Sequence, residues 1–262
     1  MLHDLYEWLA TPISGAAGHF IAPAVSWHGR IMTFAWGVLV PLAVVLARFF
    51  KVMPRQHWPA TLDNKTWWHG HRWCNYCAQA VTVIGICLVW QQDGYGGAVR
   101  DVHAALGWFL FALGLLQVLG GHLRGTKGGP TAPRRDVHGA AIDLHGDHYD
   151  MTPRRIWFER VHKSLGYLAL LLAMAAIAMG LWTADAPRWM WLVLACWWGG
   201  LLSLAVRLQR QGRCIDTYQA IWGLDPSLPG ATLKPVGWGV RKLGKGMASG
   251  EQELNRARGP FS

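Results

Sequence analysis

Four histidines occupy a similar position in four successive apolar segments of the chain. His28, His71, His103 and His162 each stand near the N-terminal end of such a segment, with an arginine or lysine within three residues. An ionisable side chain at membrane depth is costly, so it usually has a partner and a function. Neutral imidazole is also a common metal ligand. The set therefore predicts metal chemistry, with ordinary interfacial histidines and a proton relay as the alternatives.

The segments that carry these histidines are long enough to cross a bilayer. Hydrophobic residues make up 52% of the 262 positions and charged residues only 15%. A membrane-spanning helix needs about 20 predominantly apolar residues. An all-α integral membrane protein is the fold class that follows. Five blocks of about this length contain no Asp, Glu, Lys or Arg: residues 31–47, 73–92, 102–123, 164–184 and 189–206.

The positive charge of the chain predicts its orientation in the membrane. The formal net charge is +10, and most lysines and arginines follow the first, third and fifth blocks. The segments on the other side hold only Arg30, Arg100 and Arg188. By the positive-inside rule the N-terminus is outside and the C-terminus cytoplasmic, with five spans between them. We expect a bacterial inner-membrane protein, and the charge then indicates topology rather than nucleic-acid binding.

Successive spans run in opposite directions, and this pairs the histidines by depth. His28 and His103 then lie at the outer side, and His71 and His162 at the cytoplasmic side. Two facing imidazoles inside an antiparallel four-helix bundle suit axial ligation of a haem iron. Zinc or copper would need three or four ligands at one depth. The chain lacks a C-x-x-C-H motif, so we predict two non-covalent b haems in such a bundle, plus a fifth transmembrane helix.

Cations beside the histidines are candidate partners for haem propionates. Charged nitrogens bind carboxylates through short, charge-assisted hydrogen bonds. The alternative for each cation is an interfacial side chain that extends toward water, and the sequence leaves both interpretations open. The predicted cofactor-binding cations are Arg30, Arg72, Arg100 and Lys163.

Four stretches carry a resemblance to a known family. They are H-G-R-I-M-T-F-A-W-G-V-L-V-P-L at 28–42, W-W-H-G-H-R at 67–72, H-A-A-L-G at 103–107 and H-K-S-L-G-Y at 162–167. They resemble the cytochrome b561 transmembrane domain, in particular the form attached to DOMON domains and its stand-alone bacterial relatives. The resemblance implies two b haems, ligated first-with-third and second-with-fourth histidine, and transmembrane electron transfer by an oxidoreductase.

The sequence also departs from that family. Members commonly have six transmembrane helices, whereas we expect five spans and no attached DOMON domain here. His69 competes with His71 as a ligand in W-W-H-G-H-R, and the family pattern together with Arg72 favours His71. We divide the chain into an interfacial segment at 1–22, a di-haem domain at 23–209 and a basic cytoplasmic tail at 210–262.

The cytoplasmic loop at 124–155 holds a second group of candidate metal ligands. A polar cluster of this kind suits a divalent metal or a ferric substrate, although a solvated loop is the commoner outcome. The members of the cluster are His138, Asp143, His145, Asp147, His148 and Asp150.

The predicted function is electron transfer between a donor and an acceptor on opposite membrane faces. The alternatives are a haem-bearing anchor subunit for a partner dehydrogenase and a ferric reductase. Expected partners are the lipid bilayer and a small-molecule or protein donor and acceptor. A membrane quinone and a homodimer are further candidates, and nucleic acid is not expected.

Overall fold

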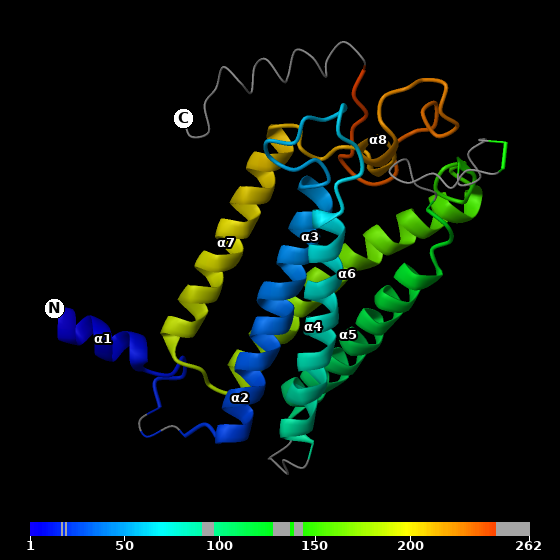
Figure 1. Ribbon diagram of the computed structural model, residues 1–262. Coiled ribbons are helices and arrows are strands. Elements are labelled where there is room, and N and C mark those ends of the chain that lie inside the picture. The colour runs from blue at the N-terminus through cyan, green and yellow to red at the C-terminus, as the bar shows by residue number, and fades with distance from the viewer. Residues whose placement is uncertain (17, 19, 91–96, 128–136, 139–143, 245–262) are drawn as a thin grey trace. The chain divides into compact units, whose positions relative to one another are not determined.

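The computed structural model describes the chain except for residues 17, 19, 91–96, 128–136, 139–143 and 245–262. The described residues form helices and two isolated β-bridges, so the predicted all-α class is confirmed. Figure 1 shows the helices in chain order. They are α1 (Leu2–Ala10), α2 (Pro23–Met32), η1 (Thr33–Leu39), α3 (Val40–Phe49), α4 (Thr66–Val89), α5 (Ala98–Leu123), α6 (Pro153–Thr183), α7 (Arg188–Arg210) and α8 (Thr217–Trp222).

Five helical spans in the described part of the chain are long and apolar enough to cross a membrane, as the sequence predicted. The chain is therefore an integral membrane protein. Some helices begin well before their apolar blocks, because backbone hydrogen bonding continues into polar sequence. Pro153 opens α6 more than two turns before His162, and Thr152 precedes it with its hydroxyl accepting from the Arg155 N–H at 3.3 Å. The spans are 23–49 (α2, η1 and α3 in succession), α4, α5, α6 and α7.

The structure divides into two compact units. Unit 1 comprises residues 1–45, 70–119 and 165–207. Unit 2 comprises residues 46–69, 120–164 and 208–262.

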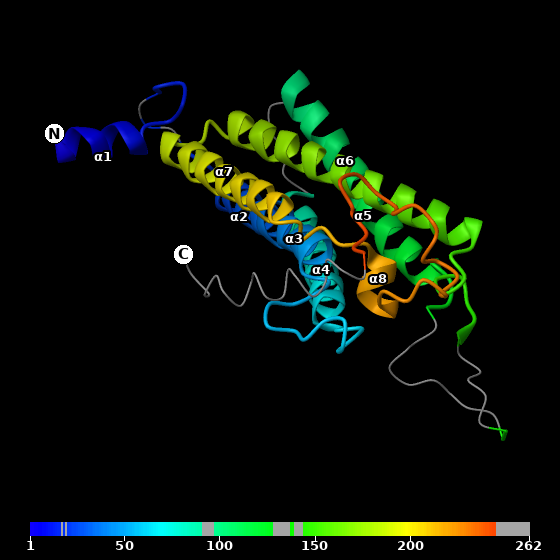
Figure 2. The same cartoon turned by 90° about the horizontal axis from the view of Figure 1, so that it is seen from above.

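The core of unit 1 is built from aliphatic residues of the spanning helices, many of them alanine, together with Trp36. Ala169, Ala173 and Ala176 recur at helical spacing on α6 and are buried. Small side chains at this spacing let helices pack closely in a membrane. Trp36 packs in the same cluster, and its indole N–H donates to the hydroxyl of Thr82 on α4 at 3.0 Å. Figure 2 shows these helices from above.

A π-helix interrupts the first span. It runs from Thr33 to Leu39 and includes Trp36 and Gly37. The Gly37 carbonyl accepts a hydrogen bond from the Trp197 indole on α7 at 2.8 Å. A π-helical turn is rare and often marks a functional segment. The apolar pattern predicted only an ordinary helix here, because hydropathy does not distinguish the two.

The N-terminal helix α1 is tied to the turn between α6 and α7 in unit 1. The Arg188 guanidinium donates to the Trp8 carbonyl at 3.2 Å and lies 5.0 Å from the centre of the Trp8 ring. The Ser14 backbone N–H and hydroxyl both donate to Asp185, at 3.0 and 2.5 Å. Leu2 and Tyr6 of α1 are exposed, and an interfacial segment at 1–22 stays a prediction.

Unit 2 contains a packed C-terminal segment where the sequence indicated a basic tail. Residues 208–244 include Cys214, Tyr218 and Trp222, all buried. The side chain of Asp216 caps α8 by accepting from the Gln219 N–H at 3.4 Å. The apolar run in α8 is too short to show helical periodicity, so its burial could not be inferred from sequence. The end of the predicted tail, residues 245–262, lies outside the described residues.

Candidate functional site

His28 of α2 and His103 of α5 face one another in unit 1. Their ring centres are 6.2 Å apart, with an angle of 76° between the ring planes. His103 is half-buried, and the His28 ring is partly buried where it meets α4. The structure thus brings together the first and third predicted ligands.

Each of these histidines is held by a backbone carbonyl of a neighbouring helix. His28 Nδ1 lies 2.8 Å from the Gly85 oxygen of α4, and His103 Nδ1 lies 3.0 Å from the Ala176 oxygen of α6. A carbonyl oxygen only accepts, so Nδ1 carries the proton in both rings. The unprotonated Nε2 is then the nitrogen available to a metal, and such a carbonyl partner is usual for metal-ligating histidines.

The pair fits a single metal ion between the two rings. With nitrogen–metal bonds of about 2 Å, two imidazole centres on opposite sides of one ion lie about 6 Å apart. The observed 6.2 Å agrees with that spacing. The site is also closely packed, since a Cβ placed on Gly180 would lie 3.1 Å from His103 Cε1. The Ala176 and Gly85 carbonyls could not be identified from the sequence, because hydrogen bonds between helices leave no pattern in one sequence.

His71 of α4 repeats the arrangement within unit 1. Its Nδ1 lies 3.0 Å from the Ala43 oxygen of α3, and the side chain is half-buried. The Asn75 amide donates to the His71 carbonyl at 2.7 Å. The competing residue His69 belongs to unit 2 and is exposed, and no such carbonyl contact holds its ring among the hydrogen bonds described. The carbonyl contact therefore favours His71 over its neighbour as a ligand.

His162 of α6 belongs to unit 2 and is held differently. Its ring stacks on Phe158 one turn earlier, with centres 5.2 Å apart and 28° between the planes. Because His71 is assigned to unit 1, the pairing of these two histidines stays a prediction.

The four predicted propionate partners have varied surroundings. Arg30 is exposed and lies 5.2 Å from the Trp27 ring centre, and Arg100 is exposed. The Arg72 Nε donates to the Tyr76 hydroxyl at 3.2 Å. Lys163 is half-buried, with an ion pair described below. A contact between any of them and a propionate stays a prediction.

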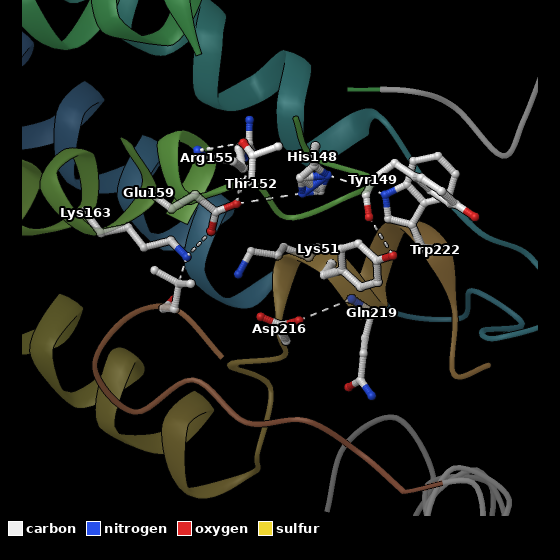
Figure 3. A network of polar contacts seen from close by, with 12 residues as sticks. Lys51, His148, Tyr149, Thr152, Arg155, Glu159, Lys163, Asp216, Gln219 and Trp222 are labelled. Atoms are coloured by element: carbon white, nitrogen blue, oxygen red, sulfur yellow. Dashed lines mark hydrogen bonds and ion pairs between the residues drawn. The ribbon is translucent and has the colours of Figure 1, made fainter. Parts of the chain in front are cut away.

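A buried carboxylate organises the polar residues of unit 2 (Figure 3). Glu159 is 4% exposed, and its Oε1 accepts from Arg155 Nη2 at 3.0 Å and Nε at 3.1 Å. Its Oε2 accepts from Lys163 Nζ at 2.7 Å, and Lys163 also donates to the Val236 carbonyl at 2.7 Å. The spacing of Arg155, Glu159 and Lys163 is i, i+4, i+8 on α6. Opposite charges at this spacing indicate ion pairs on one face of a helix, and the sequence alone could have shown them, but Glu159 was not among the predicted site residues.

His148 contacts the same carboxylate from the 124–155 loop. It is 0% exposed, and its Nδ1 accepts from the Trp222 indole at 3.4 Å. Its Nε2 lies 3.7 Å from Glu159 Oε1. Burial, reinforced by the nearby Arg155 charge, lowers the pKa of His148 to about 3. His148 is therefore neutral at physiological pH.

Two lysines of unit 2 complete the polar surroundings. Lys51 is buried and donates to the Ile215 carbonyl at 3.0 Å, and desolvation lowers its pKa to about 8. Lys242 donates to the carbonyls of Gly230 and Ala231 at 2.7 and 3.0 Å. Backbone carbonyl oxygens thus accept hydrogen bonds from both ammonium groups, of which only Lys242 belongs to the C-terminal tail.

The loop cluster does not assemble a metal site within the described part of the chain. Asp147 pairs with Arg154 at 3.1 Å, and the Asp150 side chain accepts from the Gly146 N–H at 3.0 Å. His145 packs against Tyr149, and His138 is exposed. No three His, Cys, Asp or Glu residues of the described ranges are grouped to hold a metal. Asp143 lies outside those ranges.

Comparison with known proteins gives relatives at low sequence identity. Ferric-chelate reductase 1 of Bos taurus is 28% identical over 155 residues, covering 59% of this chain and 22% of the relative. The human protein of that name is 27% identical over 179 residues, covering 68% and 26%. A cytochrome b561 and DOMON domain-containing protein of Arabidopsis thaliana is 22% identical over 179 residues, covering 68% and 37%. No family model matches, and no solved structure matches.

The fold defines the chain as an integral membrane protein, and His28 and His103 face one another between its helices. The relatives support, at low identity, the resemblance to the cytochrome b561 family. This family implies haem b as the cofactor. The chain spans only 22 to 37% of the length of the three relatives described above.

Proposed function

We propose that this chain carries electrons across the membrane through two bis-histidine b haems. His28 and His103 would ligate the haem near the outer face, and His71 and His162 the haem near the cytoplasmic face. The observation that carries the proposal is a shared arrangement, in which His28, His71 and His103 each direct Nδ1 to a carbonyl of a neighbouring helix. Proton-relay histidines would not need the same nitrogen held in all three.

The residues of the chain would position the haems and exclude water. Each Nδ1–H···O=C hydrogen bond fixes the ring orientation and makes Nε2 a stronger donor to iron. The haem iron supplies one-electron chemistry when bound. The apolar helices exclude water from the ligand rings, so the proposal requires no nucleophile or covalent step. Arg30, Arg72, Arg100 and Lys163 remain candidates for the propionates.

The proposal extends to topology and partners. The Lys and Arg asymmetry supports an outside N-terminus, a cytoplasmic C-terminus and residence in a bacterial inner membrane. The domain division at 1–22, 23–209 and 210–262 belongs to the same proposal. Donor and acceptor would be small molecules, redox proteins or a membrane quinone, and a homodimer is compatible with this function. Two of the relatives above are named ferric-chelate reductase, which makes a ferric chelate one candidate acceptor.

Haem quantitation on monodisperse protein tests the proposal. We expect a pyridine haemochrome ratio of two haems per chain. His28→Ala and His103→Ala should each remove the same haem, and His71→Ala and His162→Ala the other. His69→Ala is the matched control and should keep both haems. A wild-type ratio of one or zero contradicts the proposal.

A proteoliposome experiment tests the transfer itself. Oriented protein should pass electrons from an impermeant reductant outside to an acceptor trapped inside. The His71→Ala variant should lose most of this flux while keeping the outer haem. Equal flux in wild type and variant would show that electrons do not pass through the haem pair.

A further inference from the structure

The ring of His162 contacts a side chain of its own helix. It stacks on Phe158, and the Arg155 guanidinium lies 5.5 Å from the centre of the same Phe158 ring. A guanidinium over an aromatic face is attracted by the ring quadrupole. The support of His162 therefore continues through Phe158 to Arg155.

Glu159 fixes the position of Arg155 within this support. Two guanidinium nitrogens of Arg155 approach a single Glu159 oxygen at 3.0 and 3.1 Å. Glu159 lies three residues before His162 on α6, so the two share a helix face. One carboxylate thus controls the group that covers the stacking partner of His162.

The Glu159 charge is also poorly screened. Its side chain is 5% exposed, and salt screens buried charges far less than exposed ones. His148 beside it is neutral at physiological pH. Solvent therefore compensates little when the charge of Glu159 or of a neighbouring group is removed, and the local electrostatic potential changes. The charged groups that surround Glu159 come from several segments of unit 2: Arg155 and Lys163 from α6, Lys51 from the segment after α3, and Asp216 at the start of α8.

We propose that Glu159 is a positioning residue for the haem that His162 ligates. Its buried negative charge disfavours the added electron and so lowers the midpoint potential of that haem, while Arg155 and Phe158 hold the His162 ring. The difference in potential between the two haems would then depend on this carboxylate. The inference builds on the proposed two-haem function and goes beyond it in assigning a residue that sets one potential.

A redox titration of purified two-haem protein tests the inference. Glu159→Gln should raise the potential of one haem only, so that its reduced-to-oxidised ratio at a fixed ambient potential increases about tenfold. For a one-electron couple this is a shift of about 59 mV. Lys163→Gln removes a positive charge beside the same site and should shift the same haem in the opposite direction. Glu7→Gln on exposed α1 is the matched control and should shift neither haem.

A background that lacks the other haem identifies the one that moves. In His103→Ala protein the remaining haem should still respond to Glu159→Gln. Unchanged potentials, a shift of the other haem, or shifts of the same sign for Glu159→Gln and Lys163→Gln would each overturn the inference. If Glu159→Gln does not fold, Lys163→Gln tests the inference. A lowered potential of the same haem supports it, and an unchanged or raised potential overturns it. A haemochrome ratio below two in wild type would instead indicate failure of the proposed function.

Discussion

The two units hold their predicted ligands by different means. In unit 1, His28, His71 and His103 are oriented by backbone carbonyls of neighbouring spanning helices. In unit 2, His162 is oriented by Phe158, with charged side chains behind it. Ligand geometry in unit 1 therefore follows from helix packing, whereas in unit 2 it follows from the identity of particular side chains.

The two units should differ in how well they tolerate amino-acid substitutions. A carbonyl is present at every position, so many side chains can change in unit 1 while the ligand hydrogen bonds persist. An ionic network in a dry environment requires all of its members, because a lone buried charge is costly. We expect unit 2 to be the more sensitive region to single substitutions and to pH.

The largest expected effect is loss of a buried ion-pair partner in unit 2. Arg155→Met leaves Glu159 less compensated and should lower the free energy of unfolding by about 3–5 kcal/mol. Thermal unfolding in detergent followed by circular dichroism measures this. Arg154→Met is the matched control, because its pair with Asp147 is exposed and should contribute under about 1 kcal/mol. Equal effects of the two substitutions would remove the contrast between buried and exposed pairs.

A smaller effect is expected for the best-defined side-chain hydrogen bond of unit 1. Thr82→Val keeps the shape but leaves the buried Trp36 indole N–H without its acceptor. The cost should be about 1–3 kcal/mol, measured in the same unfolding assay. Thr82→Ser retains the hydroxyl and should recover part of the loss. A Thr82→Val cost above that of Arg155→Met would reverse the predicted order of the two units.

The pH dependence of stability should be traceable to His148. Its folded pKa of about 3 lies below the ordinary value of 6.5, so the unfolded chain binds more protons between these values. Stability is therefore complete above about pH 6.5 and falls by up to about 1.4 kcal/mol for each pH unit below it. Melting temperatures at pH 7 and pH 5 test this. His148→Gln should flatten the dependence, whereas His145→Gln, at an exposed site of the same loop, should leave it unchanged.

The smallest expected effect concerns space around the His103 ring in unit 1. Gly180→Ala places a methyl group 3.1 Å from His103 Cε1, so the ring must move by a few tenths of an ångström. We expect a stability loss of about 1 kcal/mol and a change in the low-temperature absorption bands of one haem. Gly199→Ala faces open space and is the control. Identical spectra of the two variants would show that the fit around His103 is loose.

The amino-acid sequence by itself determined the spanning helices and the histidines that they carry. Local composition predicts the five spans, because a segment that crosses a bilayer must be apolar over about 20 residues. The uneven distribution of Lys and Arg between the loops predicts their orientation. His28 and His103 could be paired from the alternating direction of the spans alone, because every second span begins at the same depth. The choice of His71 over His69 came from a family resemblance, and the structure adds a carbonyl partner for His71.

Only the tertiary structure decided which atoms hold those histidines. The oxygens of Gly85, Ala43 and Ala176 are backbone groups, and one sequence contains no sign of which carbonyl a distant ring will meet. The same reason applies to His148, which the sequence grouped with a polar metal-binding loop. It is buried against Trp222, a residue 74 positions away in the chain. Burial of a polar loop depends on what packs over it, and that contact exists only in the folded chain.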